Sequence, residues 1–201
     1  MLEIDIKSTW FDTKAKLCIK PESLEIEKKT FWGSKLISIP KDSVVKFRYG
    51  LKWIQIYHFT IGRIYFVDIV DTKGRLSKIR MWGFNKNEIL EGTEQYEKTL
   101  NALFDCYFDD ISQKFLDKFN KVVNFEILDV IFSEIGIDFN DKRGIIKWND
   151  VGTSSFQDYY SIYSKSNPLV YKSFEYGNEW NVGVLYSVSR QILKEKGLWS
   201  E

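Results

Sequence analysis

Residues that build most enzyme sites are scarce in this chain, which has one histidine, two cysteines and three prolines among 201 residues. His58 is the one imidazole that could activate a serine or cysteine nucleophile. Its place in the alternating run 56–59 predicts a half-buried strand residue instead. The chain also lacks the ligand spacing of a zinc site, a phosphate-binding Gly-Lys-Ser/Thr loop and a dinucleotide-binding glycine motif. We therefore expect no metal, no cofactor and no enzyme activity.

The low cysteine content also indicates the cellular compartment in which the chain folds. Cys18 and Cys106 favour a reducing environment over a disulfide framework, and a single bridge between them is left open. Segment 1–7 carries acids where a signal peptide has a basic start and an apolar run. Apolar stretches are interrupted within a few residues, far short of the ~20 that span a bilayer. We expect a cytoplasmic protein that is not transmembrane.

Neither sign of charge dominates, since 29 Lys and Arg face 28 Asp and Glu. Proteins that neutralise phosphates usually show a basic excess or a basic stripe, whereas acids and bases are interspersed here, as in segment 25–28. We therefore expect no nucleic-acid partner. Aromatic residues are abundant at 16%, and the burial they supply makes a long disordered stretch unexpected.

The hydrophobic pattern predicts strands, a helix, more strands and a second helix. From residue 17 to 81 the dominant period is two, with turn signals between short runs and a hairpin expected at 71–74. Helical spacing follows, opened by Asn85 and Glu88 in a near capping box, with Gly92 expected to interrupt or kink the helix. Period two returns after Asn124, and a final helix is expected from Asn181 to Lys196. This order predicts an α+β fold with antiparallel strands.

The two halves invite comparison as an internal repeat of architecture. Segment 39–44 can be laid on segment 146–151, because each has an isoleucine, a short polar turn and a valine. Segment 65–71 can be laid less tidily on segment 159–165. We expect a first unit at 1–123 and a second at 124–201. The alternative is one continuous α+β domain with the long helix across a single sheet.

At this point the chain resembles the bacterial pleckstrin-homology-like (PH-like) proteins, in tandem. The resemblance rests on the Ile-x-Trp-x-Asp-Val step at 146–151 with the helix from Asn181, and more loosely on 39–44 with the helix from Asn85. It implies two antiparallel β-meander or barrel-like sheets, each closed by an amphipathic helix. The second half is short for a seven-stranded unit, so we expect it to lack one or more strands.

The resemblance also implies candidate ligand contacts, because the family's best-known activity is phosphoinositide binding by basic residues on the first hairpins. The matching candidates for a lipid head group or another anion are Lys28, Lys35, Lys46 and Arg48. Lys46 and Arg48 stand at i and i+2, so they share one strand face and could meet one phosphate. Nearby acids oppose this hypothesis, and a solvated strand face is the plainer interpretation.

Seven tryptophans are the remaining unusual feature. Core packing at strand ends is the simpler interpretation for each of them. The alternative is an aromatic protein-binding surface, because Trp and Tyr are enriched in interface hot spots. Its candidate residues are Phe31, Trp32, Tyr49 and Trp53.

These observations predict a non-enzymatic intracellular binding module with a protein partner, of the immunity or scaffold type. The first alternative is a PH-like module that binds phospholipid at a membrane surface. The second is an unrecognised enzyme, which would show a deep pocket with converging polar groups and perturbed pKa values. Partner identity and oligomeric state are not set by the sequence.

Overall fold

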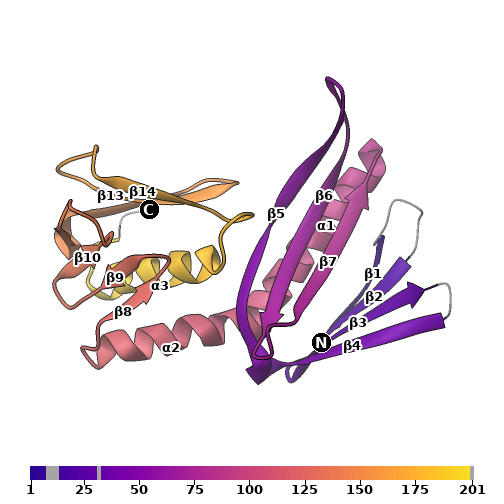
Figure 1. Cartoon of the computed structure of the whole chain (residues 1–201), viewed down its shortest axis with the longest axis horizontal. Helices are drawn as coiled ribbons and strands as arrows, with labels where there is room; N and C mark the ends of the chain where they lie inside the picture. The colour runs from indigo at the N-terminus through magenta and orange to yellow at the C-terminus, as the bar shows by residue number, and fades with distance from the viewer. Residues whose placement is uncertain (8–13, 31–32, 200–201) are drawn as a thin grey trace. The chain divides into compact units, whose positions relative to one another are not determined.

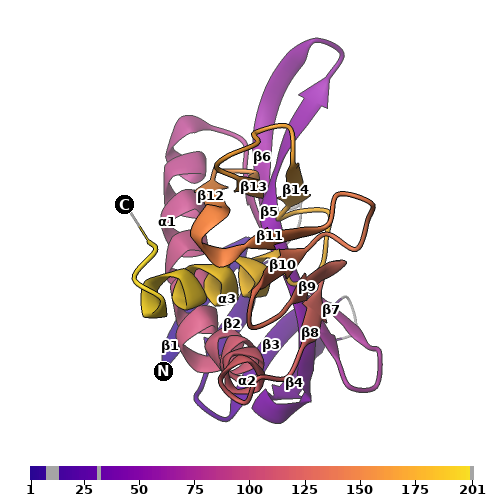
Figure 2. The same cartoon turned by 90° about the vertical axis from the view of Figure 1, so that its left-hand side faces the viewer.

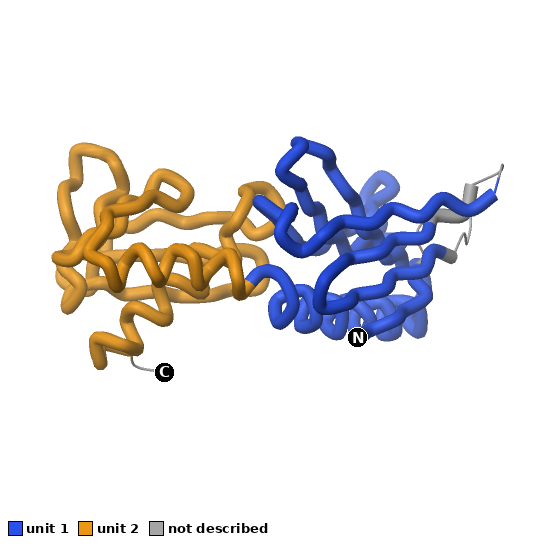
Figure 3. The backbone as a smooth tube through the Cα atoms, turned by 90° about the horizontal axis from the view of Figure 1, so that it is seen from below, with its two compact units in different colours: residues 1–108 blue, residues 109–201 orange. Residues whose placement is uncertain are grey.

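The computed structural model describes residues 1–7, 14–30 and 33–199. The chain forms two compact units, Met1–Phe108 and Asp109–Glu201 (Figure 3). The division falls inside a helical run, whereas the sequence placed it after residue 123. Amphipathic periodicity continues across the whole helical run, so the sequence held no signal for a boundary within it.

Unit 1 consists of two antiparallel meanders followed by a helix (Figure 1). The first meander contains β1 (Leu2–Lys7), β2 (Lys14–Ile19), β3 (Ser23–Thr30) and β4 (Gly33–Pro40). A 3-10 turn, η1 (Lys41–Ser43), leads to the second meander, which contains β5 (Val44–Ile56), β6 (Phe59–Asp71) and β7 (Leu76–Gly83). Helix α1 (Lys86–Leu103) and a π-helical turn, η2 (Phe104–Phe108), complete the unit. Strand β1 was not predicted, although its alternating sequence carries the signal.

Alternation of apolar and polar residues builds the core of unit 1. Leu17 and Ile19 of β2 and Leu24 and Ile26 of β3 are all at most 1% exposed, as expected where one sheet face is buried. The second meander packs against α1 through the face that carries Tyr65, whose hydroxyl lies 2.6 Å from the hydroxyl of Thr93. The opposite face of the second meander is therefore not covered by α1.

The start of α1 confirms the sequence prediction, and its interior corrects it. The Asn85 side chain accepts a hydrogen bond from the Glu88 amide at 3.0 Å, and the Glu88 carboxylate accepts one from the Phe84 amide. We expected Gly92 to interrupt or kink the helix, but α1 continues through it without interruption. It lies within α1 opposite Tyr65, where an added Cβ would come within 3.3 Å of the tyrosine ring. Close packing therefore explains this glycine better than helix breaking does.

Unit 2 begins with α2 (Asp109–Asn120) and continues as strands. The first meander contains β8 (Phe125–Ile127), β9 (Val130–Phe132), β10 (Gly136–Asp138) and β11 (Ile145–Lys147). The 3-10 turn η3 (Trp148–Asp150) leads to β12 (Val151–Ser155), β13 (Tyr159–Ser164), β14 (Tyr171–Glu175) and α3 (Val182–Glu195). The run 125–132 is a hairpin rather than one strand, because Leu128 and Asp129 adopt positive φ angles of 53° and 57°. Its two-residue turn lacks the glycine that would have signalled it.

Both units therefore contain a four-stranded meander, a 3-10 turn, a three-stranded meander and a helix, in that order. The two turns match closely: the Ser43 carbonyl accepts from the Thr72 amide at 2.8 Å, and the Asp150 carbonyl accepts from the Lys165 amide at 2.7 Å. The expectation that unit 2 lacks strands was wrong, because its strands are short rather than missing. Laying 65–71 on 159–165 was also one residue out of register, since these pairings make Thr72 the counterpart of Lys165.

The α+β class with antiparallel sheets is confirmed. The described strands form four separate sheets, and none of these sheets closes into a barrel. Cys18 and Cys106 are both unpaired, which settles the pairing that the sequence left open. Across the described ranges, no helix is long and apolar enough to cross a membrane.

Candidate functional site

The predicted basic residues fall into two pairs on different sheets of unit 1. Lys28 and Lys35 are cross-strand partners in β3 and β4, near the turn that joins these strands. Lys35 is exposed, and the side chain of Lys28 is outside the described part of the structure. Lys46 and Arg48 lie on β5, where they share one face as predicted. The surface that the structure assembles is built around this second pair.

Strand β6 is the centre of this surface. Its residues alternate between the face that packs on α1 and the opposite face, which carries Phe66 and Asp68. The register places Asp68 between Arg48 of β5 and Lys78 of β7, and Phe66 between Gly50 and Arg80. In Figure 1, α1 lies behind β6 and β7, so this face is the one turned to the viewer. We call it the cationic face, and it comprises Lys46, Arg48, Lys52, Lys78 and Arg80 around Asp68.

A buried carboxylate holds two of these cations in place. Asp68 is 1% exposed, and it accepts hydrogen bonds from Arg48 Nε at 3.1 Å and from Arg80 Nη2 at 2.6 Å. Paired charge-assisted hydrogen bonds are directional, so both guanidinium groups are fixed beside the sheet. Five cations and one carboxylate leave the face with a formal charge of +4.

An aromatic ring packs against two cations of the face, Lys52 and Arg80. Phe66 is 4% exposed, with Lys52 Nζ 5.3 Å and the Arg80 guanidinium 5.2 Å from its ring centroid. Cations at this distance are attracted to the negative face of the ring. The stem of Lys52 thus covers an apolar residue and keeps its charged end outside, whereas the Arg80 guanidinium is held inward by Asp68.

The charge of this region differs from that of the whole chain. Residues 43–87 contain nine of the 29 Lys and Arg but only two of the 28 Asp and Glu. Both acids are in ion pairs, Asp68 as described and Asp71 with Arg75 at 2.6 Å. Sequence reasoning missed this excess because the acids elsewhere cancel it in the total. A count over a window would have found it.

The hairpin of β5 and β6 extends beyond the rest of its sheet. Arg63 of β6 pairs with Gly83, the last residue of β7, and the two hairpin strands continue past this point to a turn at Tyr57 and His58. Figure 1 shows the turn beyond the end of β7 and of α1, and Figure 2 shows it beyond α1. His58 is exposed in this turn, so its expected place within a half-buried strand was wrong.

Four large side chains at this end are open to solvent. Tyr57 is 93% exposed, Phe59 75%, Trp53 50% and Ile56 48%. We call these four residues the aromatic tip. The Arg63 guanidinium lies 4.0 Å from the Trp53 ring centroid, so a cation borders the tip. An exposed cluster of this kind generally marks an interaction site.

The other predicted interface aromatics have different positions. Tyr49 is half-buried, and its ring packs edge-on against Phe104 with centroids 5.8 Å apart. This contact gives it a packing role in unit 1. Phe31 and Trp32 lie outside the described residues.

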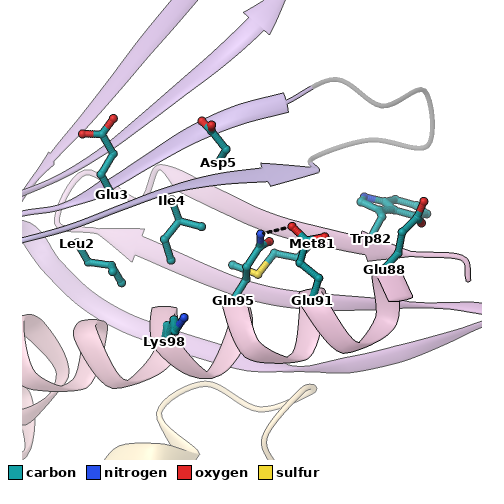
Figure 4. A pocket seen from close by; sticks show the side chains of 11 residues that line it. Leu2, Glu3, Ile4, Asp5, Met81, Trp82, Glu88, Glu91, Gln95 and Lys98 are labelled. Carbon is teal, nitrogen blue, oxygen red and sulfur yellow. Dashed lines mark hydrogen bonds between the residues drawn. The ribbon is translucent and has the colours of Figure 1, made fainter. Parts of the chain in front are cut away.

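A second feature of unit 1 is an open acidic cleft of about 720 Å³ between β1, β7 and α1 (Figure 4). Glu3 and Asp5 reach it from β1, and Glu88 and Glu91 reach it from α1. A hydrogen bond from Lys16 lowers the pKa of Glu3, the opposite of the shift that a general acid needs. Among the described residues, no three His, Cys, Asp or Glu side chains are grouped to hold a metal ion. None of the described side chains that line the cleft is a nucleophile paired with a base.

Comparison with known proteins finds no family model, no curated protein and no solved structure that matches this chain. The fold and its surfaces thus define an α+β protein with two antiparallel units, the first of which carries a cationic sheet face and an exposed aromatic tip.

Proposed function

We propose that the chain is a non-enzymatic binding module of two PH-like units and that unit 1 binds the surface of membranes rich in anionic phospholipid. The observation that carries this proposal is the cationic face. Lys46, Lys52 and Lys78 are exposed on it, while Arg48 and Arg80 are positioned by Asp68. The PH-like part of the proposal is supported by the shared order of four strands, a turn, three strands and a helix.

The exposed lysines set the size of the electrostatic attraction. A Lys or Arg near an anionic membrane surface contributes about 1 kcal/mol, and this attraction decays within a Debye length. The three exposed lysines together therefore contribute about 3 kcal/mol, a factor of roughly one hundred in affinity. Arg48 and Arg80 contribute less because they share the carboxylate of Asp68.

A protein partner, the leading expectation from the sequence, is the alternative occupant. An acidic protein surface would also complement the cationic face. Lipid is favoured by the hairpin that carries Lys52, because between Asp42 and Asp68 the chain has four Lys and Arg and no acid. The same hairpin ends in an apolar tip, a combination that suits a membrane interface.

The test is sedimentation of the full chain with lipid vesicles. Binding to phosphatidylcholine vesicles that contain phosphatidylglycerol should exceed binding to phosphatidylcholine alone, and it should weaken as salt rises. Replacing Lys46, Lys52 and Lys78 with Gln should weaken binding roughly one hundredfold. The matched control replaces three exposed lysines of unit 2, Lys114, Lys121 and Lys142, and should bind as the parent does.

Absence of binding to anionic vesicles would overturn the lipid proposal. If a tagged form of the chain then captured one stoichiometric protein from its native cell, and the triple Gln variant released it, protein binding would replace lipid binding as the function of the cationic face.

A further inference from the structure

We propose that the β5–β6 hairpin is an insertion element and that the aromatic tip, Trp53, Ile56, Tyr57 and Phe59, enters the interfacial region of the bilayer. This inference rests on the proposed function, and it adds an apolar contact to an electrostatic one. It assigns a role to side chains that contribute little to the fold.

The exposure of the tip separates it from the core. Tyr57 and Phe59 are 93% and 75% exposed, so they bury little surface within the chain. The backbone beneath them is paired, since Ile56 pairs with Phe59 across the turn, with one register shift between Ile54 and Gln55. The hairpin thus presents apolar side chains on an ordered support, which reduces the entropy that binding must overcome.

The backbone conformation of Tyr57 supports the same inference. Its φ of 53° lies in the left-handed region, which residues with a Cβ avoid and which Gly and Asn adopt more readily. A tyrosine at this position destabilises the turn, and its side chain is too exposed for burial to offset that cost. Strain of this kind is found at functional sites, but Val122 shares it, so the exposure of the tip and the charges beside it carry the inference.

The charges around the tip identify the ligand as a lipid surface. The Arg63 guanidinium stacks on Trp53, with its centre 4.0 Å from the ring centroid, so a positive charge lies directly beside the tip. Lys52 and the other residues of the cationic face follow along the same sheet. From the turn inward, the hairpin thus presents apolar side chains, then an aromatic ring with a guanidinium, then lysines. A bilayer interface has the matching order of acyl chains, glycerol region and anionic head groups.

The experiment compares two tip variants of the full chain on vesicles of phosphatidylcholine and phosphatidylglycerol. Ile56→Ser with Phe59→Ser should weaken binding roughly tenfold or more, because two large apolar groups no longer leave water. The loss should persist at high salt, where the electrostatic part is screened. The matched control is Ile135→Ser with Leu169→Ser, which alters two exposed aliphatic residues of unit 2 and should leave binding unchanged.

The second variant, Tyr57→Asn, guards against misfolding because Asn suits the left-handed turn. It should raise the melting temperature and still weaken vesicle binding several-fold. Its control is Val122→Asn, which relieves a φ of 57° at another exposed residue and should raise the melting temperature without changing binding.

The depth of insertion is measured with an environment-sensitive dye attached through Tyr57→Cys, in a chain that also carries Cys18→Ser and Cys106→Ser. The dye should be shielded from water and quenched by spin labels near the head groups. If the dye stays in water and both tip variants bind as the parent does, the insertion proposal is overturned. The lipid proposal would still stand provided that the triple Gln variant loses binding. Capture of a single protein that depends on the tip, with the dye unquenched by lipid, would instead identify the tip as a protein-docking surface.

Discussion

At the scale of single residues, Asp68 is the side chain on which the cationic face depends. A buried carboxylate between two guanidinium groups costs desolvation free energy, which its hydrogen bonds to Arg48 and Arg80 offset. Because those arginines are only 29% and 25% exposed, removal of the carboxylate leaves two partly buried charges without their counterion. The same residue therefore affects stability and the charge that the face presents.

Asp68→Asn should lower the free energy of unfolding by about 2 kcal/mol, the range of a lost hydrogen-bonded charge, as measured by urea unfolding. The same variant should bind anionic vesicles more tightly, since the face loses its one negative charge. Asp129→Asn is the control, because Asp129 is 75% exposed and lies 3.8 Å from Lys172, and it should change stability by less than about 0.5 kcal/mol. An unchanged stability in Asp68→Asn would contradict the role assigned to this carboxylate.

At the scale of secondary-structure elements, the start of α1 was the most accurately predicted feature. The capping interaction depends on residues three positions apart, so the sequence contains all of it. The length of the β5–β6 hairpin was not predictable in the same way. Alternation marks a strand, but it does not show that β7 ends before its neighbours do and leaves the tip unsupported.

Asn85→Ala should lower the free energy of unfolding by about 1 kcal/mol, because the first turn of α1 loses the acceptor for the Glu88 amide. Chemical denaturation measures this loss. Asn87→Ala, two residues further into the same exposed turn, should be neutral or slightly stabilising because Ala is the better helix former. Equal losses in the two variants would show that Asn85 does not cap the helix.

At the scale of the whole molecule, the charges set how stability depends on pH. Hydrogen bonds from Arg143 lower the pKa of Asp141 from 3.8 to about 2, and a hydrogen bond from Ser164 lowers the pKa of Asp150. Burial acts to raise the pKa of Asp71, but hydrogen bonds from Arg75 and Lys73 outweigh it and lower the value. All three carboxyl groups are thus held in the ionised form by the fold.

A carboxyl group whose pKa is lower in the folded than in the unfolded chain stabilises the fold while it is ionised. This contribution is complete above the unfolded pKa of about 4 and is lost as pH falls through the folded value. The urea midpoint should therefore be steady above about pH 5 and decline between about pH 4 and pH 2. Asp141→Asn should show a shallower decline, and a midpoint that rises on acidification would refute this assignment.

The sequence by itself determined the α+β class, the antiparallel strands, the capped start of α1 and the matching turns before β5 and β12. Each of these depends on residues a few positions apart, where periodicity and turn chemistry act directly. Only the tertiary structure decided the rest. Cross-strand register joined Arg48 to Asp68 and Asp68 to Arg80 across as many as 32 positions of sequence, and packing against η2 placed the Tyr49 ring against Phe104. The different lengths of β5, β6 and β7 left Trp53, Tyr57 and Phe59 exposed, because a side chain is buried or free according to where its neighbouring strand ends.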